Sequence, residues 1–268
     1  MIALSVNVNK IALLRNSRDT AIPDVMAFAR ICLDEGAEGI TVHPRPDQRH
    51  IRADDCRRLA SVFDDIRQSR SAENAPFPLF EFNIEGNPFA GARPSERDGV
   101  SAYPGFMELI RELTPEQCTL VPDGDDQLTS DHGFDLERDG DRLSPILAEL
   151  RQLGVRSSLF MDPNPHQMQL AKDIGADRIE LYTESYAKAF ETGHNVDDVF
   201  ERFADSAEAA VAAGLGVNAG HDLNLANLPR FSSIPGLMEV SIGHALTVDA
   251  LHMGMSAAVR AYRAALAS

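Results

Sequence analysis

Residues 34–43 read DEGAEGITVH, in which a glycine ends a helical pattern and a short apolar run follows almost at once. A related order returns three times, as QLGVR at 152–156, DIGAD at 173–177 and AAGLG at 212–216. Each glycine is typical of the position just past a helix end, in a tight loop that leads into a strand. The recurrence predicts repeated strand–helix units rather than separate domains.

Eight short apolar or alternating runs are expected to be strands, at residues 3–9, 39–43, 78–85, 118–122, 156–162, 178–183, 215–219 and 239–243. Helical patterns occur at residues 23–35, 53–68, 105–113, 142–153, 165–174, 196–213, 223–228 and 248–266. This alternation predicts an α/β fold, a closed parallel (β/α)8 or TIM barrel. An open doubly wound sheet is the second choice, but the GxGxxG pattern follows none of the predicted strands.

The length of 268 residues fits one such barrel, which typically has about 250, so a single domain over residues 1–268 is expected. Loop and helix insertions extend the repeat. Residues 86–102 are rich in Gly and Pro, and residues 123–135 are acidic. Both follow strands and should lie on the C-terminal face, where active-site loops lie. We interpret the second as a mobile lid, whereas the first is equally compatible with a plain surface loop.

The amino-acid composition indicates which kinds of molecule the protein can bind and where it works. Lys and Arg number 25 against 41 Asp and Glu, a formal net charge of −16, which argues against nucleic acid or an anionic membrane. It does not exclude a small anion held by backbone N–H groups. Cys32, Cys56 and Cys118 have no CxxC spacing and are expected to be reduced packing residues. The sequence shows no signal peptide or apolar span, so a cytoplasmic location without membrane contact is expected.

Alternation along the strands predicts a polar barrel interior. Ser5 and Asn7 lie on the opposite face of their strand from apolar neighbours, and so do Glu81 and Glu85 in theirs. Because helices cover a parallel barrel from outside, the apolar face must point outward and the polar face inward. Buried carboxyls need partners, so Ser5, Glu81 and Glu239 are expected to join a core network. Polar residues at C-terminal strand ends are better candidates for function.

A basic cluster ends the second strand, where residues 41–50 read TVHPRPDQRH. Arg45 suits a phosphate or carboxylate through forked, charge-assisted hydrogen bonds, and His43 and His50 titrate near neutral pH. A lone histidine is more often structural, but the strand-end position beside Arg45 favours a function for His43.

Two carboxyls lie at comparable positions. Glu85 belongs to FNIEG at 82–86, and Glu180 belongs to RIELYT at 178–183. A carboxyl enclosed by a barrel can have a raised pKa, which suits a general base at neutral pH.

Glycine–histidine pairs end the last two strands, in VNAGHDL at 217–223 and SIGHALT at 241–247. The loops after strands seven and eight of many barrels bind phosphate together with a helix N-terminus, and glycine lets the backbone approach. No HExxH or other metal-ligand spacing occurs, so no metal is expected. The remaining histidines are expected in loops or at the surface: His132, His166, His194 and His252.

These segments resemble the pyridoxine 5'-phosphate synthase family, in the same order and with similar spacing from about residue 4 to residue 262. The resemblance also rests on VNVNKIALLRNSR at 6–18, LVPD at 120–123, SLFMDP at 158–163 and IELYTESYA at 179–187. It implies a (β/α)8 barrel that forms homo-octamers and acts as a transferase. The implied reaction condenses 1-deoxy-D-xylulose 5-phosphate with 3-amino-2-oxopropyl phosphate to pyridoxine 5'-phosphate, phosphate and water, without metal or organic cofactor.

The resemblance implies roles for matching residues. His43 and Glu85 would be general bases, His221 the general acid, and Glu180 a group that stabilises a transition state. The implied substrate-binding residues are Asn7 and Arg18 for the amino ketone phosphate or its neighbourhood, Arg45, His50 and Thr129 for deoxyxylulose phosphate, and Gly243 and His244 for a phosphate.

Three departures from the family pattern matter. Many members read VNID followed by His, where this chain reads Val6-Asn7-Val8-Asn9-Lys10. An amide and an ammonium therefore replace a carboxylate and a histidine at the substrate, and Lys10 is expected to supply a phosphate charge. Asp222 follows His221 where some members carry glycine, which removes one easy backbone approach to substrate. Residues 86–102 are longer than in many members. We interpret all three as variation within the family.

Two other functions remain open. An aldolase or epimerase could use the same barrel, but a Schiff-base aldolase needs a lysine at a strand end inside it. Apart from Lys10, the chain has only Lys172 and Lys188, in a predicted helix and a loop. A non-catalytic phosphate sensor would need no acid–base residues at the strand ends.

Overall fold

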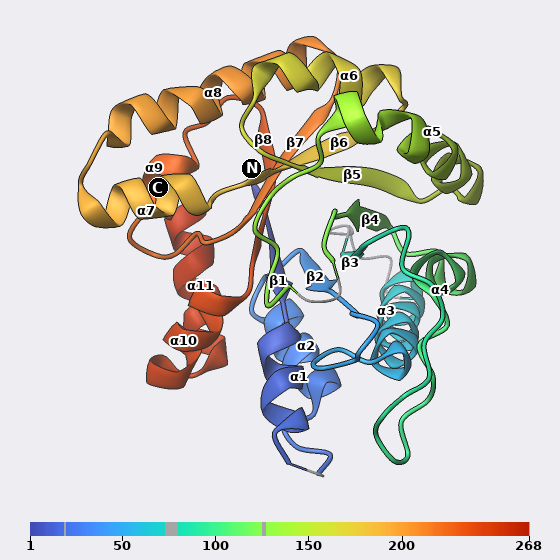
Figure 1. The fold of residues 1–268 in the computed structure, drawn as a ribbon. Coiled ribbons are helices and arrows are strands. Elements are labelled where there is room, and N and C mark those ends of the chain that lie inside the picture. Colours follow the sequence, from blue (N-terminus) through green and yellow to red (C-terminus); the bar gives the residue numbers. More distant parts are fainter. Residues whose placement is uncertain (19, 73–79, 125–126, 268) are drawn as a thin grey trace.

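The computed structural model describes residues 1–18, 20–72, 80–124 and 127–267. Parallel strands close into a barrel in chain order, with helices around the outside (Figure 1). The strands are β1 (Ala3–Asn7), β2 (Gly39–Val42), β3 (Glu81–Gly86), β4 (Gln117–Leu120), β5 (Arg156–Met161), β6 (Arg178–Tyr182), β7 (Gly216–His221) and β8 (Leu237–Ile242). Strand β8 pairs with β1, where Leu4 lies opposite Val240, and so completes the ring. The predicted (β/α)8 barrel is therefore confirmed.

The helices of the described residues alternate with these strands, some as pairs. They are α1 (Asn9–Asn16), α2 (Val25–Asp34), α3 (Ala53–Ala72), α4 (Phe106–Leu113), α5 (Leu136–Leu153), a 3-10 turn η1 (Pro165–Gln167), α6 (Met168–Asp173), α7 (Glu184–Thr192), α8 (Val196–Ala212), α9 (Leu228–Phe231), α10 (His244–Met253) and α11 (Met255–Leu266).

The predicted strand at residues 3–9 was too long. The chain turns after Asn7, whose side-chain oxygen accepts the backbone N–H of Asn9 at 3.0 Å. Helix α1, absent from the prediction, begins there. The strand predicted at 78–85 runs from Glu81 to Gly86, and residues 78–79 lie outside the described part of the chain.

Other helix predictions also need correction. Helix α7 was not predicted; it ends at Gly193, whose φ of +70° separates it from α8. The helix expected at 248–266 is two helices, because Gly254 with φ of +84° breaks it. Helix α5 starts six residues before the expected 142, because Asp135 caps it by accepting the N–H of Glu137. Of the helix predicted at 223–228, only residue 228 is helical, as the first residue of α9.

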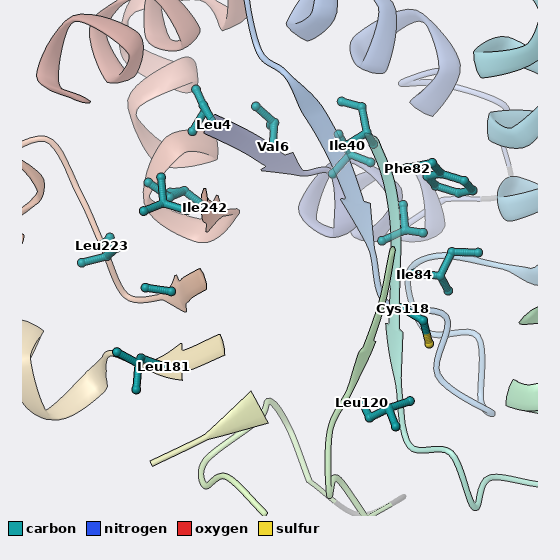
Figure 2. Close-up of a cluster of buried hydrophobic side chains, with 14 of the residues drawn as sticks. Leu4, Val6, Ile40, Phe82, Ile84, Cys118, Leu120, Leu181, Leu223 and Ile242 are labelled. Atoms are coloured by element: carbon teal, nitrogen blue, oxygen red, sulfur yellow. The ribbon is translucent and has the colours of Figure 1, made fainter. Parts of the chain in front are cut away.

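The apolar core lies between the strands and the surrounding helices. Leu4 and Val6 of β1, Ile84 of β3 and Ile242 of β8 are at most 1% exposed and point away from the barrel axis (Figure 2). Burying an aliphatic side chain of this size contributes roughly 1.5–3 kcal/mol. The free cysteines Cys32, Cys56 and Cys118 lie in the same core, and burial raises the pKa of each thiol. Their predicted packing role is confirmed.

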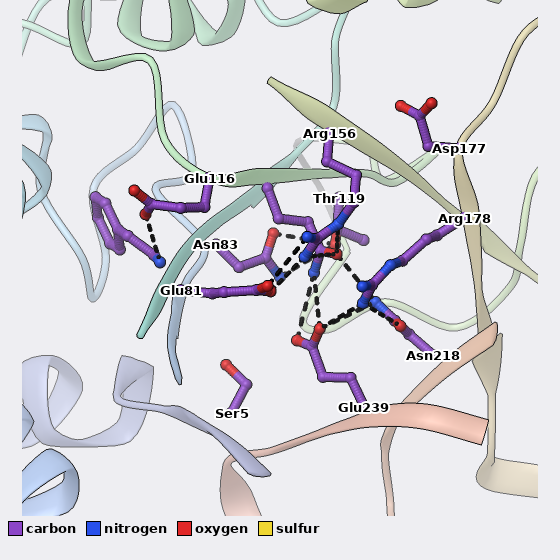
Figure 3. Close-up of polar contacts among 12 residues, drawn as sticks. Ser5, Glu81, Asn83, Glu116, Thr119, Arg156, Asp177, Arg178, Asn218 and Glu239 are labelled. Atoms are coloured by element: carbon purple, nitrogen blue, oxygen red, sulfur yellow. Dashed lines mark hydrogen bonds and ion pairs between the residues drawn. The ribbon is translucent and has the colours of Figure 1, made fainter. Parts of the chain in front are cut away.

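Polar side chains fill the barrel interior (Figure 3). Glu239 accepts from Gln117 and from Arg178, at 3.3 and 3.2 Å. Arg156 pairs with Glu81. Burial and then the Glu81 charge raise the pKa of Glu239 to about 7.

Higher in the barrel, the hydroxyls of Ser5 and Thr41 lie 2.7 Å apart. The predicted core network is confirmed for Glu81 and Glu239, which Arg156 and Gln117 join, whereas Ser5 bonds to Thr41.

Candidate active site

A cavity of about 400 Å³ opens where the strands reach their C-terminal ends. It is lined by nearly all of the residues proposed from the sequence: Asn7, Asn9, Lys10, His43, Arg45, His50, Glu85, Thr129, Glu180, His221, Asp222, Gly243 and His244. Arg18 is the exception, because it lies exposed in the turn after α1 and does not line the cavity. Strand ends far apart in the sequence thus meet at one site, as a parallel barrel requires.

The sequence did not reveal several other lining residues. Leu13 was missed with helix α1, and Leu128 and Ser130 lie in the acidic segment that was treated as a unit, of which residues 125–126 lie outside the description. Phe160 and Val121 form a small apolar cluster with Tyr182 at the barrel mouth. The available signal for Phe160 was its place two residues after Ser158, on the inward face of β5.

His43 and Glu85 form a pair at the ends of β2 and β3. His43 Nδ1 lies 4.0 Å from Glu85 Oε2, which is too long for a direct hydrogen bond. Burial, reinforced by the Arg45 charge, holds the pKa of His43 well below its usual range. Burial and the Glu180 charge raise the pKa of Glu85 well above its usual range. Both shifts favour the uncharged forms, so burial opposes an ion pair between the imidazole and the carboxyl.

The end of β1 organises this pair. Asn7 Nδ2 donates to Glu85 Oε2 at 3.4 Å, and the Asn9 side-chain oxygen accepts the backbone N–H of His43 at 2.9 Å. Lys10 follows in the first turn of α1 and brings a cation to the cavity wall. Both asparagine side chains therefore hold other groups of the site in place: Asn7 holds the Glu85 carboxyl, and Asn9 holds the backbone of His43.

Glu180 lies deeper, on β6, and is 3% exposed. It accepts from the Thr119 hydroxyl at 3.3 Å. Burial, and then the Glu239 charge, raise the pKa of Glu180 to about 8. The carboxyl is therefore largely protonated at neutral pH and can donate as well as accept a hydrogen bond.

This pKa gives Glu180 a measurable effect on stability. The native state holds the Glu180 proton up to about pH 8, whereas the unfolded chain loses it near its ordinary value of 4.5. The free energy of unfolding of the wild type is expected to fall by a few kcal/mol between pH 5 and 8 relative to Glu180→Gln, which cannot ionise. Urea unfolding across this range measures the difference.

The exposed Glu184 of α7 provides the matched control, since Glu184→Gln should keep the pH dependence of the wild type. Parallel curves for the wild type and Glu180→Gln would contradict the raised pKa.

His50 faces the cavity as a fixed hydrogen-bond donor. Its Nδ1 accepts the backbone N–H of Ile51 at 2.9 Å, so the proton of the neutral ring lies on Nε2. Burial and the Arg45 charge lower the pKa of His50 to about 3. Asn16 holds this loop from α1, donating to the backbone oxygens of Arg49 and His50 at 3.0 and 2.7 Å.

Arg45 is anchored by the carboxylate that ends the LVPD motif. Asp123, at the end of the β4 segment, pairs with Arg45 and accepts the Ser130 hydroxyl at 2.7 Å. Arg45 also donates to the backbone oxygen of Gln127 at 3.3 Å. The loop after β4 is therefore tied to the same guanidinium that lines the cavity.

The ends of β7 and β8 need their glycines. A Cβ at Gly220 would lie 2.3 Å from Glu180 Oε1, and one at Gly243 would lie 3.0 Å from the Asn7 Cβ. Gly243 also precedes α10, whose first N–H groups have no partner within the helix. This corner of the cavity suits an anion.

The charges in the cavity favour an anionic ligand. Lys10, Arg45 and Arg49 line it, against the carboxylate of Asp222, while burial raises the pKa of both Glu85 and Glu180 and so favours their neutral forms. Within the described residues, no group of three or more His, Cys, Asp or Glu side chains is placed to hold a metal ion. In the same part of the chain, no helix is long and apolar enough to span a membrane.

Fold and site together define a class, a (β/α)8-barrel enzyme with acid–base groups and cations around one cavity at the C-terminal strand ends. The chain belongs to the family of the pyridoxal phosphate biosynthesis protein PdxJ, whose family model matches residues 4–268. The family inferred from the sequence motifs is thereby confirmed.

Curated relatives agree with this assignment. A pyridoxine 5'-phosphate synthase of Xanthomonas axonopodis pv. citri (strain 306) is 53% identical over 260 residues, covering 97% of this chain and 94% of the relative. One from Xylella fastidiosa (strain M23) is 51% identical, covering 97% of this chain and 92% of the relative. The family places the chain in vitamin B6 biosynthesis.

Solved structures support the fold alone. A structure of 3-hexulose-6-phosphate synthase aligns with a TM-score of 0.55 at 12% identity, over 99% of this chain and 100% of the other. A structure of KGPDC from Streptococcus mutans aligns with a TM-score of 0.58 at 10% identity, over 99% and 97%.

Proposed function

We propose that this chain is a pyridoxine 5'-phosphate synthase. It condenses 1-deoxy-D-xylulose 5-phosphate with 3-amino-2-oxopropyl phosphate and closes the pyridine ring, releasing phosphate and water. The observation that carries the proposal is the meeting of His43, Glu85 and His221 around one cavity, in a chain whose close relatives bear that name. The reaction needs several acid–base groups around one bound intermediate.

The protonation states suggest how the roles divide. The amine and the ketone form an imine with loss of water, which needs a proton donor to the departing hydroxyl. Burial raises the pKa of Glu85 and so favours its protonated form, which can supply that proton and then act as a base once ionised. Neutral His43 can accept a proton from the start, in the later enolisation and dehydration. His221 is assigned the proton donation, and Glu180 stabilises the transition state by hydrogen bonding.

The binding roles follow the cavity wall. The deoxyxylulose phosphate lies against the cations and donors of β1, β2 and the β4 loop: Asn9, Lys10, Arg45, His50 and Thr129. The amino ketone phosphate is assigned to Asn7 and to the corner formed by Gly243 and His244. Asp222 was expected to bind substrate as well; it lines the cavity, but its carboxylate lies against His221. Arg18 serves the same phosphate only if a rearrangement or another subunit brings it there. The protein is also proposed to act as one barrel domain in the cytoplasm, as a homo-octamer without metal or organic cofactor.

A turnover assay tests the function directly. Purified protein without added metal is mixed with both substrates, the amino ketone phosphate being generated in situ. Pyridoxine 5'-phosphate and free phosphate are expected in equal amounts, and His221→Ala should lose at least about 100-fold of the rate. No product, with phosphate ligands still raising the melting temperature, would instead favour another sugar-phosphate enzyme or a sensor.

A further inference from the structure

The ring of His221 is held on both of its nitrogens. Its Nδ1 lies 2.7 Å from Asp222 Oδ2, and its Nε2 lies 2.8 Å from the Thr129 hydroxyl. The ring of Tyr182 contacts it edge-on, with centroids 5.3 Å apart. The imidazole thus has a carboxylate on one side, the loop after β4 on the other, and an aromatic ring fixing its plane.

The backbone at this position has an uncommon conformation. His221 ends β7 with a φ of +97°, in the region that residues with a side chain rarely adopt. Thr183 of the neighbouring strand end stabilises the bend, because its hydroxyl donates to Gly220 O at 2.8 Å and accepts the Asp222 N–H at 3.2 Å. The turn is therefore braced from β6.

The same contacts show what Asp222 can offer the cavity. Its backbone N–H is directed to Thr183, so it is not available for a substrate phosphate. Its side chain lines the cavity and is 35% exposed, with one oxygen on His221. The contribution of this residue to the site is therefore its carboxylate, which a glycine at this position would lack.

We propose that Asp222 is a positioning residue that acts through His221 and fixes its ring in the Nδ1–H form. An ionised carboxylate only accepts hydrogen bonds, so the ring nitrogen beside it must carry a proton. The other nitrogen, Nε2, then faces the cavity and Thr129. Because a charged imidazole donates from both nitrogens, the protonated ring would donate to Asp222 and to a cavity group at once.

The proton transfer follows from this geometry and rests on the proposed function. His221 passes its Nε2 proton to the leaving oxygen of the bound intermediate, which departs as water or as hydrogen phosphate. The C–O bond electrons remain on that oxygen, and the electrons of an adjacent C–H bond, whose proton passes to His43, form the new C=C bond. The His221 ring becomes the neutral Nδ1–H tautomer, still bound to Asp222. When no substrate is bound, the Thr129 hydroxyl forms a hydrogen bond with the same Nε2.

The test compares Asp222→Asn and Asp222→Ala with the wild type. Nitrogen-15 NMR of histidine-labelled protein reports the ring, and loss of the signal in His221→Gln identifies it. The wild type is expected to show a proton on Nδ1, and both variants a shift toward the Nε2–H tautomer. The kcat should fall about 10- to 100-fold while the KM of each substrate changes less than about threefold.

The control is Asp198→Asn, which removes one exposed charge from the first turn of α8 and should match the wild type. If it reproduced the effect, net charge would be the cause and the proposal would fail. Unchanged NMR signals and kcat in both Asp222 variants would also overturn it. So would a rise in the KM of the amino substrate alone, since Asp222 would then be a binding group.

The two proposals can fail separately. A wild type that forms no pyridoxine 5'-phosphate removes the proposed function, while the NMR measurement on the same protein still decides whether Asp222 fixes the ring of His221.

Discussion

Glu85→Gln is expected to lower kcat by about 100- to 10,000-fold, the usual contribution of a positioned acid–base group. Glutamine keeps the shape of the side chain and can still accept from Asn7, but it cannot release or take up a proton. His43 would lose the carboxyl whose Oε2 lies 4.0 Å from its Nδ1. Steady-state kinetics with both substrates saturating, which report kcat, provide the measurement.

Glu81→Gln is the matched control, since Glu81 lies on the same strand and the same inward face, four residues earlier. It pairs with Arg156 and does not line the cavity, so its variant should retain most of the wild-type kcat. A Glu85→Gln variant within about threefold of the wild-type kcat would show that Glu85 transfers no proton in the slow step.

Arg15→Leu is expected to lower the free energy of unfolding by about 3–5 kcal/mol, because it leaves a buried carboxylate without its cation. Arg15 and Asp55 have side chains only 5% and 4% exposed, and two hydrogen bonds of 2.5 and 2.8 Å join them. The backbone N–H of Arg52 would remain as a partner of Asp55, at 2.8 Å. Urea unfolding at pH 7 gives the change.

The double variant Arg15→Leu with Asp55→Leu should recover most of this loss, because no unpaired charge remains in the core. A single variant that loses less than about 1 kcal/mol would mean that Asp55 reaches solvent or is protonated. Arg15→Leu should also weaken the binding of deoxyxylulose phosphate, because the Arg15 guanidinium donates to the backbone oxygen of His50 at 3.2 Å and this hydrogen bond would be lost.

The sequence was sufficient where one strand or one turn carries the signal. The period-two pattern of β1 and β3 separated the outward apolar face from the inward polar face without knowledge of any partner. The C-terminal strand ends then predicted the meeting of His43, Glu85 and His221, because parallel strands of a barrel all end at one rim.

The sequence was insufficient where the outcome depends on contacts between distant segments. The raised pKa of Glu85 arises from burial and from Glu180 and Asp123, which only the closed barrel brings near. Helix α1 starts in a segment that alternates like a strand, at a bend where the Asn7 side-chain oxygen accepts the Asn9 N–H. The anchoring of Arg45 by Asp123 has no local pattern at all, since the two lie 78 residues apart.

The polar barrel interior has a consequence for the heat capacity of the protein. Unfolding of a barrel filled with Val, Ile and Leu exposes apolar surface, which raises the heat capacity, whereas exposing amide, carboxyl and guanidinium groups lowers it. Here the centre of the barrel holds Gln117, Asn218, Arg178 and Glu239. The heat-capacity change of unfolding is therefore smaller than for an aliphatic barrel of equal length, and the curve of stability against temperature is broader and flatter.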